Sequence, residues 1–360
     1  MTHVQTPVVQ GVQQAQRKVY VGMSGGVDSS VTAALLKEQG YDVTGVYMKN
    51  WSQDLPGFAC PWKQDYQDAK RVTVQLGIPF KLYDFETEYR ERVVDYMFDG
   101  YRAGITPNPD IMCNQEVKFK LFLSAALEDG ADMIATGHYA RSRGGQLLAG
   151  VDGNKDQSYF LYRVMSEALE HSLMPVGEYE KPVVRELARK YGLATAEKKD
   201  SQGICFVGKV GIKEFLQQFV ETEPGAIIDA QGREIGQHEG ALFYTIGQRH
   251  GLNVGGGLPY YVIGKDMDKN EVYVTNDLQD GRLWHKEVSI TSAHWINDEP
   301  QDGGRYQVRT RYRAPLVPCT LQRSETGWVV QMDEEVRALT PGQSAVVYEK
   351  DRVVGGGIVM

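Results

Sequence analysis

Extended and helix-like segments alternate through the first half of the chain, and this alternation limits the possible fold more than any other feature. An apolar segment at residues 18–22 is followed by helical periodicity at residues 31–36, and the pattern then repeats. Repeated strand–helix units predict an α/β domain with a mainly parallel sheet and helices on both faces. The expected strands are residues 18–22, 43–48, 80–85 and 132–136, and the expected helices include residues 65–76 and 93–101. Ligands of such sheets bind at the carboxyl ends of the strands.

The pattern changes twice further along the chain. Between residues 166 and 222, helix-like segments at 181–191 and 212–219 flank a polar loop at 197–208, which predicts a small, mainly helical middle domain. From residue 223 to residue 360, short alternating segments and turn signals such as Asp302-Gly303-Gly304 predict a β-barrel. We therefore expect an α/β domain over residues 17–165, then the middle domain and the barrel, after a disordered tail of residues 1–16.

The charge balance argues against a surface that binds nucleic acid as a whole. The formal net charge is −8, and the apolar (42%) and charged (24%) fractions are those of an ordinary globular protein. Any RNA contact must therefore come from a local basic patch. Arg309, Arg311 and Arg313 alternate and would form a basic ridge on one face of a strand; the alternative is a solvated arginine face. Lys155, Lys198 and Lys199 would extend this ridge.

Cysteine usage favours the cytoplasm. Four cysteines are scattered along the 360 residues without a C-x-x-C pair or zinc-type spacing, so we expect reduced thiols and no dedicated metal site. Residues 1–16 lack a signal-peptide pattern, and no apolar run approaches the roughly 20 residues needed to cross a membrane. Nothing in the sequence indicates an obligate oligomer, and we expect a monomer.

A glycine- and serine-rich loop, Gly22-Met23-Ser24-Gly25-Gly26-Val27-Asp28-Ser29-Ser30, joins the first expected strand to the first expected helix. Glycines let a backbone approach an anion closely, and the N–H groups of a first helical turn favour phosphate. The pattern is neither a Walker loop nor G-x-G-x-x-G. A glycine-rich turn without a ligand is the alternative.

The S-G-G-V-D-S-S pattern resembles the PP-loop (N-type) ATP pyrophosphatases, which split ATP between its α and β phosphates. This resemblance implies ATP bound with Mg²⁺ and adenylation of an acceptor oxygen. Met48, otherwise a core methionine, would line the adenosine end together with Gly137. The residues expected to bind ATP are Gly22, Met23, Ser24, Gly25, Gly26, Val27, Asp28, Ser29, Met48 and Gly137.

Two cysteines far apart in sequence lie in loops that suggest reactivity. Cys113 follows the turn-rich segment Asn108-Pro109-Asp110, ahead of a helix expected from about Glu116, and Cys205 lies in the polar loop of the middle segment. A helix N-terminus favours a thiolate. Taken separately, each cysteine is more typical of a small buried residue than of a catalytic one. Cys60 and Cys319 are expected to be structural.

Five motifs in a fixed order connect these observations. They are the PP-loop, N-P-D-x-x-C-N, G-H-Y-A-R, K-D-Q-S-Y-F-L and S-Q-G-I-C-F. In this order the chain resembles the bacterial tRNA-specific 2-thiouridylases (the MnmA family) over nearly its whole length. The resemblance implies ATP-dependent 2-thiolation of the wobble uridine (position 34) of tRNA. It also implies tRNAs of the Lys, Glu and Gln type, and a sulfur-carrier protein as partner.

The resemblance also implies residue roles. Cys205 would carry the incoming sulfur as a persulfide, Cys113 would be the nucleophile that attacks it, and Asp110 would act as acid and base. A Cys113–Cys205 disulfide would remain. Asn108, Pro109 and Asp110 would face the target base. The residues expected to contact the RNA are His138, Lys155, Asp156, Gln157, Arg311, Tyr312 and Gln343.

Three other readings remain open from the residues themselves. The chain could be a PP-loop ligase that adenylates a small molecule, which would release pyrophosphate without RNA. It could be an adenine-nucleotide sensor that binds ATP without turnover. Finally, Cys113, Cys205 and one further ligand could hold an iron–sulfur cluster in place of the persulfide relay.

Overall fold

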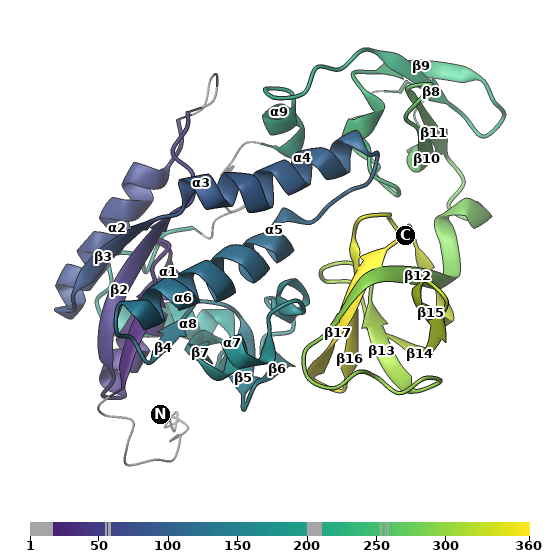
Figure 1. Ribbon diagram of the computed structural model, residues 1–360. Helices are drawn as coiled ribbons and strands as arrows, with labels where there is room; N and C mark the ends of the chain where they lie inside the picture. Colours follow the sequence, from purple (N-terminus) through teal and green to yellow (C-terminus); the bar gives the residue numbers. More distant parts are fainter. Residues whose placement is uncertain are drawn as a thin grey trace.

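The computed structural model describes residues 17–54, 56, 59–199, 211–252, 254–255, 257 and 259–360. The strands of these residues form three sheets, and Figure 1 shows helices between the first sheet and the C-terminal barrel. No helix among the described residues is long and apolar enough to cross a membrane.

The first sheet confirms the predicted parallel architecture. Its order is β3-β2-β1-β4-β7, and every neighbouring pair is parallel. The strands are β1 (Lys18–Gly22), β2 (Asp42–Lys49), β3 (Phe80–Asp84), β4 (Met133–Ala135) and β7 (Ser172–Leu173). Val19 and Val21 of β1 belong to one hydrophobic cluster and Tyr20 to another. Because successive side chains of a strand point to opposite faces, helices must cover both faces of this sheet.

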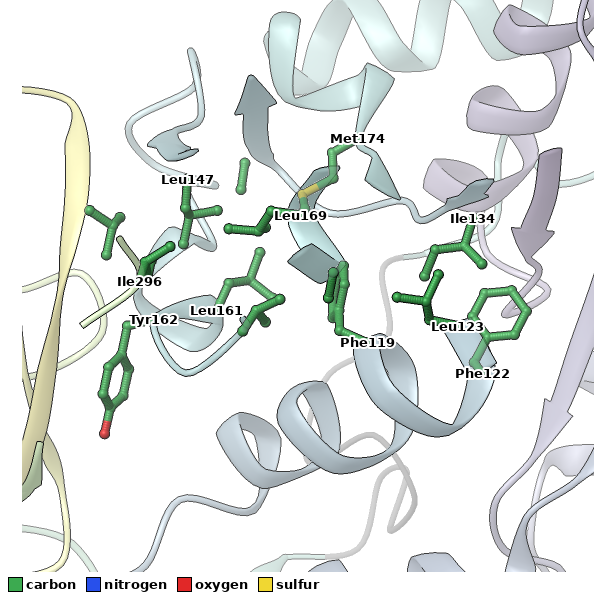
Figure 2. Close-up of a cluster of buried hydrophobic side chains, with 14 of the residues drawn as sticks. Phe119, Phe122, Leu123, Ile134, Leu147, Leu161, Tyr162, Leu169, Met174 and Ile296 are labelled. Carbon is green, nitrogen blue, oxygen red and sulfur yellow. The ribbon is translucent and has the colours of Figure 1, made fainter. Parts of the chain in front are cut away.

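Helices of the first domain supply these two layers. One cluster contains residues of α1 (Val27–Glu38), α2 (Trp62–Leu76) and α8 (Lys181–Lys190). The other contains Phe119, Phe122, Leu123 and Ile134, which pack together in Figure 2. The remaining α-helical segments are α3 (Glu86–Tyr89), α4 (Asp95–Arg102), α5 (Pro109–Met112), α6 (Phe122–Glu128), α7 (Ser166–Glu170) and α9 (Ile212–Leu216).

Two continuous helical rods span residues 86–102 and 109–128. Each contains a π-helical stretch, η2 (Arg90–Val94) in the first and η3 (Cys113–Leu121) in the second, and the rods pack side by side (Figure 1). The short 3₁₀ turns are η4 (Ser158–Leu161), η5 (Pro175–Glu178), η6 (Ala241–Phe243) and η7 (Gly281–Leu283).

The prediction of a mainly helical middle domain is wrong. The helix-like segment at 181–191 is α8, which packs on α1, and β7 extends the first sheet beside β4. The second sheet instead has the order β10-β11-β8-β9 and is mixed, because β8 pairs parallel with β11 and antiparallel with β9. Its strands are β8 (Gly225–Ile228), β9 (Glu234–His238), β10 (Tyr261–Asp266) and β11 (Glu271–Thr275).

A C-terminal barrel is confirmed, but it begins at Trp284 and not at residue 223, because β8–β11 form the separate mixed sheet. Residues 284–359 are all described, and their strands follow the order β12-β15-β14-β13-β16-β17, with a β12–β17 pairing that closes the barrel. The strands are β12 (Trp284–Trp295), β13 (Arg305–Arg309), β14 (Val317–Ser324), β15 (Gly327–Arg337), β16 (Ser344–Glu349) and β17 (Arg352–Val359).

A hairpin of the first domain adds to this barrel. Its strands β5 (Ala140–Arg143) and β6 (Gln146–Ala149) follow β4, and β6 pairs with β17 through Leu147 opposite Val353. Leu147 and Val353 are fully buried in the cluster that also contains Phe122, so the barrel and the first domain share a core (Figure 2).

Candidate active site

The loop after β1 lies at the switch point of the first sheet. The strand order runs from β1 to β2 and β3 on one side and to β4 and β7 on the other. Open parallel sheets bind ligands where the order reverses, outside the carboxyl ends of the strands. The loop at 23–26, Met48 near the end of β2 and Gly137 after β4 all lie at this edge.

The loop geometry suits an anion. Gly25 has φ +72°, and a Cβ there would lie 2.4 Å from the backbone oxygen of Asp65, so only glycine fits without strain. The Ser29 hydroxyl accepts a hydrogen bond from the Ser24 N–H at 3.2 Å and donates to the Gly26 carbonyl. Helix α1 begins at Val27, directly after Gly26, which places its first N–H groups at the loop.

Four predicted nucleotide-binding residues form two contacting pairs around this loop. A Cβ on Gly22 would lie 3.0 Å from the Met48 Cε, and a Cβ on Gly137 would lie 2.7 Å from the Ser29 backbone nitrogen. Gly137 therefore lets the chain after β4 touch the first turn of α1. Met23 and Val27 are buried in the core beneath the loop.

Asp28 has partners that the sequence did not reveal. Its two carboxylate oxygens accept hydrogen bonds from the Lys181 Nζ at 2.7 and 2.9 Å, and the Tyr139 hydroxyl donates to Oδ1 at 2.7 Å. Lys181 is the first residue of α8 and lies 153 positions further along the chain. No local pattern distinguishes it from an exposed helix start, whereas Tyr139 belongs to the recognised G-H-Y-A motif.

Lys198 supports the loop and does not extend a basic ridge. Its Nζ donates to the Gly25 carbonyl at 3.0 Å and pairs with Asp65 at 2.8 Å and Asp68 at 2.7 Å. It thereby joins the loop at residues 23–26 to the start of α2. Two carboxylates beside Lys198 raise its pKa, although burial opposes them as the largest single cause.

The cysteine motif forms the start of a helical rod. Helix α5 begins at Pro109, seven residues before the expected start near Glu116, because the Asn108 Oδ1 accepts from the Ile111 N–H at 3.3 Å and Pro109 occupies the first turn. Asp110 is half-buried in this turn. Cys113 is 1% exposed and begins the π-helical stretch η3; such stretches are frequent at functional sites.

A buried acceptor lies next to Cys113. Asn114 donates from Nδ2 to the Phe160 carbonyl at 3.1 Å, while its Oδ1 has no partner among the described residues. Cys205, the other predicted catalytic cysteine, lies outside the described residues.

The remaining cysteines have buried surroundings. Cys319 is fully buried in the barrel, and burial raises its pKa to about 12. Cys60 is half-buried, and burial raises its pKa as well. Neither thiol therefore has an environment that favours a reactive thiolate.

The predicted RNA-contact residues of the first domain lie around Tyr139, whose hydroxyl donates to Asp28. His138 is 9% exposed and its Nδ1 lies 2.8 Å from the Thr136 hydroxyl; burial and the nearby Lys118 hold its pKa well below the usual value. The Gln157 Oε1 accepts from the Tyr139 N–H at 2.9 Å. Lys155 lies in the same short loop, where the Asp152 Oδ1 accepts from its N–H.

Asp156 is a structural carboxylate in this loop. It is 4% exposed, and its Oδ1 accepts from the Gly150 and Ser158 N–H groups, each at 3.0 Å. Its Oδ2 pairs with Arg309 at 3.1 Å.

The prediction of a basic ridge along one strand is wrong. Strand β13 ends at Arg309, so Arg309, Arg311 and Arg313 do not alternate along one strand. Arg309 is committed to Asp156, and Arg313 has φ +63° and donates to the Asn154 carbonyl. Arg311 donates to the Ile246 carbonyl and the Thr340 hydroxyl, and thus joins the middle domain to the barrel.

Tyr312 and Gln343 both lie close to the first domain. The Tyr312 ring packs on Phe160, with ring centroids 4.5 Å apart. Gln343 donates from Nε2 to the Thr106 carbonyl at 2.8 Å, just before the segment that carries Asn108 and Cys113. The structure therefore brings Tyr312 and Gln343 of the barrel close to the segment that carries the cysteine motif.

Comparison with known proteins matches the described architecture. Three family models match in succession, described as "tRNA methyl transferase HUP domain" over residues 17–209, "tRNA methyl transferase PRC-barrel domain" over 213–276 and "Aminomethyltransferase beta-barrel domain" over 285–359. The second match covers the mixed sheet and agrees with the correction of the helical middle domain.

Curated relatives match along the whole chain. A protein of Idiomarina loihiensis named "tRNA-specific 2-thiouridylase MnmA" is 47% identical over 360 residues, which cover 97% of each chain. Proteins of the same name from Proteus mirabilis and Bacillus subtilis are 47% and 46% identical, and cover 96% and 95% of this chain and 97% and 94% of their own length. This chain belongs to the tRNA-specific 2-thiouridylase (MnmA) family.

Proposed function

We propose that the protein is an ATP-dependent tRNA-uridine 2-sulfurtransferase. It adenylates the wobble uridine, at position 34, and replaces the O2 oxygen with sulfur, releasing AMP and pyrophosphate. The observation that carries the proposal is that a phosphate-type loop lies at the switch point of a parallel sheet, in a chain that also carries the N-P-D-x-x-C-N motif on a buried helix start.

The first step places ATP in the loop at residues 22–29. The uridine O2 attacks the α-phosphorus, and pyrophosphate leaves. Asp28 is the carboxylate of this loop, and Mg²⁺ typically uses one or two carboxylates together with substrate phosphates, so the loop fits Mg²⁺ supplied with ATP. Bound Mg²⁺ would neutralise charge on the phosphates.

The second step uses two thiols. The Cys113 thiolate attacks the Sγ of Cys205, which carries the outer sulfur atom of the persulfide. The Cys113–Cys205 disulfide forms, and the outer sulfur atom leaves as hydrosulfide. Hydrosulfide attacks C2 of the adenylated uridine, and AMP departs. Asp110 exchanges the proton of the released sulfur. An external thiol then reduces the disulfide, and a sulfur-carrier protein reloads Cys205.

Recognition of the RNA is proposed for both domains. Asn108, Pro109 and Asp110 face the extruded base, since bases in loops are unstacked at low cost. His138, Lys155, Asp156 and Gln157 contact the RNA from the first domain, and Arg311, Tyr312 and Gln343 from the barrel. The substrates are tRNAs of the Lys, Glu and Gln type, and the protein acts as a cytoplasmic monomer.

The test is thiolation of unmodified tRNA by the purified protein, detected as retardation on a mercury-containing gel. We expect a retarded band that requires ATP and disappears when the wobble uridine is replaced. Cys113→Ser and Cys205→Ser should each abolish thiolation from a persulfide donor, whereas Cys60→Ser serves as the matched control and should retain it.

Two outcomes would contradict the proposal. Normal thiolation by both single variants would remove the persulfide relay. Pyrophosphate release without RNA and without a retarded band would favour adenylation of a small molecule. If protein purified without oxygen contains iron and absorbs visible light, these cysteines hold an iron–sulfur cluster and the persulfide relay is wrong.

A further inference from the structure

Asp28 presents an electrostatic problem at the phosphate loop. Its carboxylate belongs to the first turn of α1, where N–H groups are oriented to receive an anion. A negative side chain is favourable at an empty helix N-terminus but repels the phosphates of a nucleotide that binds there. In the absence of Mg²⁺, the loop therefore needs another cation close to Asp28 if it is to accept a triphosphate.

Lys181 supplies this cation from a different part of the chain. Its Nζ reaches both carboxylate oxygens of Asp28, at 2.7 and 2.9 Å, and its side chain is only 11% exposed. The Nζ also lies 5.4 Å from the centre of the Tyr139 ring, whose hydroxyl donates to Asp28. Among the described residues, Lys181 is the cation that pairs with Asp28.

The position of Lys181 is itself fixed by the fold. Its backbone N–H donates to the Asp152 Oδ2 at 3.0 Å, and a proline in the first turn of α8 follows it. The other oxygen of Asp152 accepts from the N–H groups of Asn154 and Lys155. Tyr139 is held by Gln157 through its N–H and its carbonyl. Both partners of Asp28 are therefore preorganised by residues 152–157.

We propose that Lys181 is a positioning residue for the nucleotide, which cancels the charge of Asp28 so that the phosphate loop accepts a triphosphate. The inference rests on the proposed function in that ATP is the ligand, and it assigns a role to a residue outside the loop. It also gives a reason why α8 packs on α1: the start of α8 delivers an ammonium group to the start of α1.

The experiment measures the affinity for ATP by calorimetry with EDTA present and RNA absent, so that any role of Asp28 as a metal ligand is removed. Lys181→Met should weaken ATP binding by roughly tenfold or more, because an unpaired carboxylate then faces the phosphates. Asp28→Asn should bind ATP at least as tightly as wild type. The double variant Asp28→Asn/Lys181→Met should return to within roughly threefold of wild type.

Control variants separate this role from a loss of structure. Lys190→Met, in the last turn of the same helix and 63% exposed, should bind ATP like wild type. Lys181→Arg retains the charge and should bind better than Lys181→Met. If circular dichroism shows that Lys181→Met does not fold, Asp28→Asn alone tests the proposal. ATP binding at least as tight as that of wild type supports it, and weaker binding contradicts it.

Three results distinguish the two proposals. Wild-type protein that does not bind ATP, with or without Mg²⁺, overturns the proposed function. If wild type binds ATP and Lys181→Met binds equally well, the role of Lys181 is overturned and the proposed function stands. The role of Lys181 is also overturned if Asp28→Asn weakens ATP binding and the double variant binds ATP more weakly than either single variant. Additive losses of affinity would indicate a merely structural contact between the two residues.

Discussion

Gln343 of the barrel donates a hydrogen bond to the carbonyl of Thr106, 237 positions earlier in the chain, and so supports the segment that leads into Asn108 and Cys113. The neighbouring Thr106 N–H donates to the Pro341 carbonyl at 2.9 Å. Between them, Gly342 has φ +89°, and a Cβ there would lie 2.9 Å from the Thr106 nitrogen. The barrel therefore holds the cysteine motif from outside the first domain.

Gln343→Ala should slow thiolation strongly but lower the stability of the fold only slightly. The substitution removes one hydrogen bond, which typically contributes about 1 kcal/mol, but it loosens the residues before Asn108. We expect a fall of roughly tenfold in the thiolation rate at saturating tRNA, since small misplacements of reacting groups are costly. Thermal unfolding and single-turnover thiolation measure the two effects. Gln322→Ala, at an exposed position of β14, is the control, and equal rates for both variants would refute the supporting role.

Arg309→Met should destabilise the fold by about 3 kcal/mol. The change leaves the carboxylate of Asp156, which is 4% exposed, without the partner 3.1 Å away, and a buried unpaired charge costs more than a lost surface pair. Urea unfolding measures the loss. Arg305→Met, on the same strand but in an exposed pair with Asp333, is the matched control and should change stability little. Similar losses for both variants would show that Asp156 does not need Arg309.

The sequence predicted the first sheet well because buried parallel strands consist of apolar runs that stand out from amphipathic helices. The expected strand at 80–85 is β3 (Phe80–Asp84), for example. The loop at residues 23–26 was placed equally well, since it joins β1 to α1 as the glycine- and serine-rich pattern predicted. The helix start at Pro109 was placed too late because Asn108 and Pro109 were read as turn residues, although both residue types also begin helices.

Other predictions failed where distant segments decide the structure. The helix at 181–190 and the short strand β7 belong with the first sheet, a pairing that no local pattern reveals. The arginine ridge assumed that a period of two continues beyond Arg309, whereas the strand ends there. Lys181 was missed because its partner Asp28 lies 153 positions away.

The cysteines should differ in reactivity in the native protein. Burial raises the pKa of Cys319 to about 12, so at pH 8 its thiol should react with iodoacetamide at least a hundredfold more slowly than after unfolding, by roughly the loss of thiolate. Cys60 is only half-buried and should be alkylated faster than Cys319 in the folded state. Mass spectrometry of the labelled peptides measures both rates. Native labelling of Cys319 as fast as that of Cys60 would show that the barrel core opens.

His138 should make the stability of the protein depend on pH below 6.5. Burial, aided by the charge of Lys118, lowers its pKa well below 6.5, so the folded state takes up a proton less readily than the unfolded chain. Above pH 6.5 both states are neutral at this residue, and it causes no difference. As the pH falls below 6.5, the unfolded chain is protonated first, and stability decreases by up to about 1.4 kcal/mol per pH unit.

His138→Asn isolates this contribution, because asparagine can still hydrogen-bond to Thr136 but does not titrate. The free energy of unfolding, measured in urea between pH 5 and pH 8, should fall less steeply for the variant than for wild type below pH 6.5. His238 and His294 also have lowered pKa values, so the comparison must be the difference between the two proteins and not the wild-type curve alone. His171→Asn, at an exposed position, is the control. Parallel curves for wild type and His138→Asn would mean that His138 takes up a proton equally readily in the folded and unfolded states, and that burial does not lower its pKa.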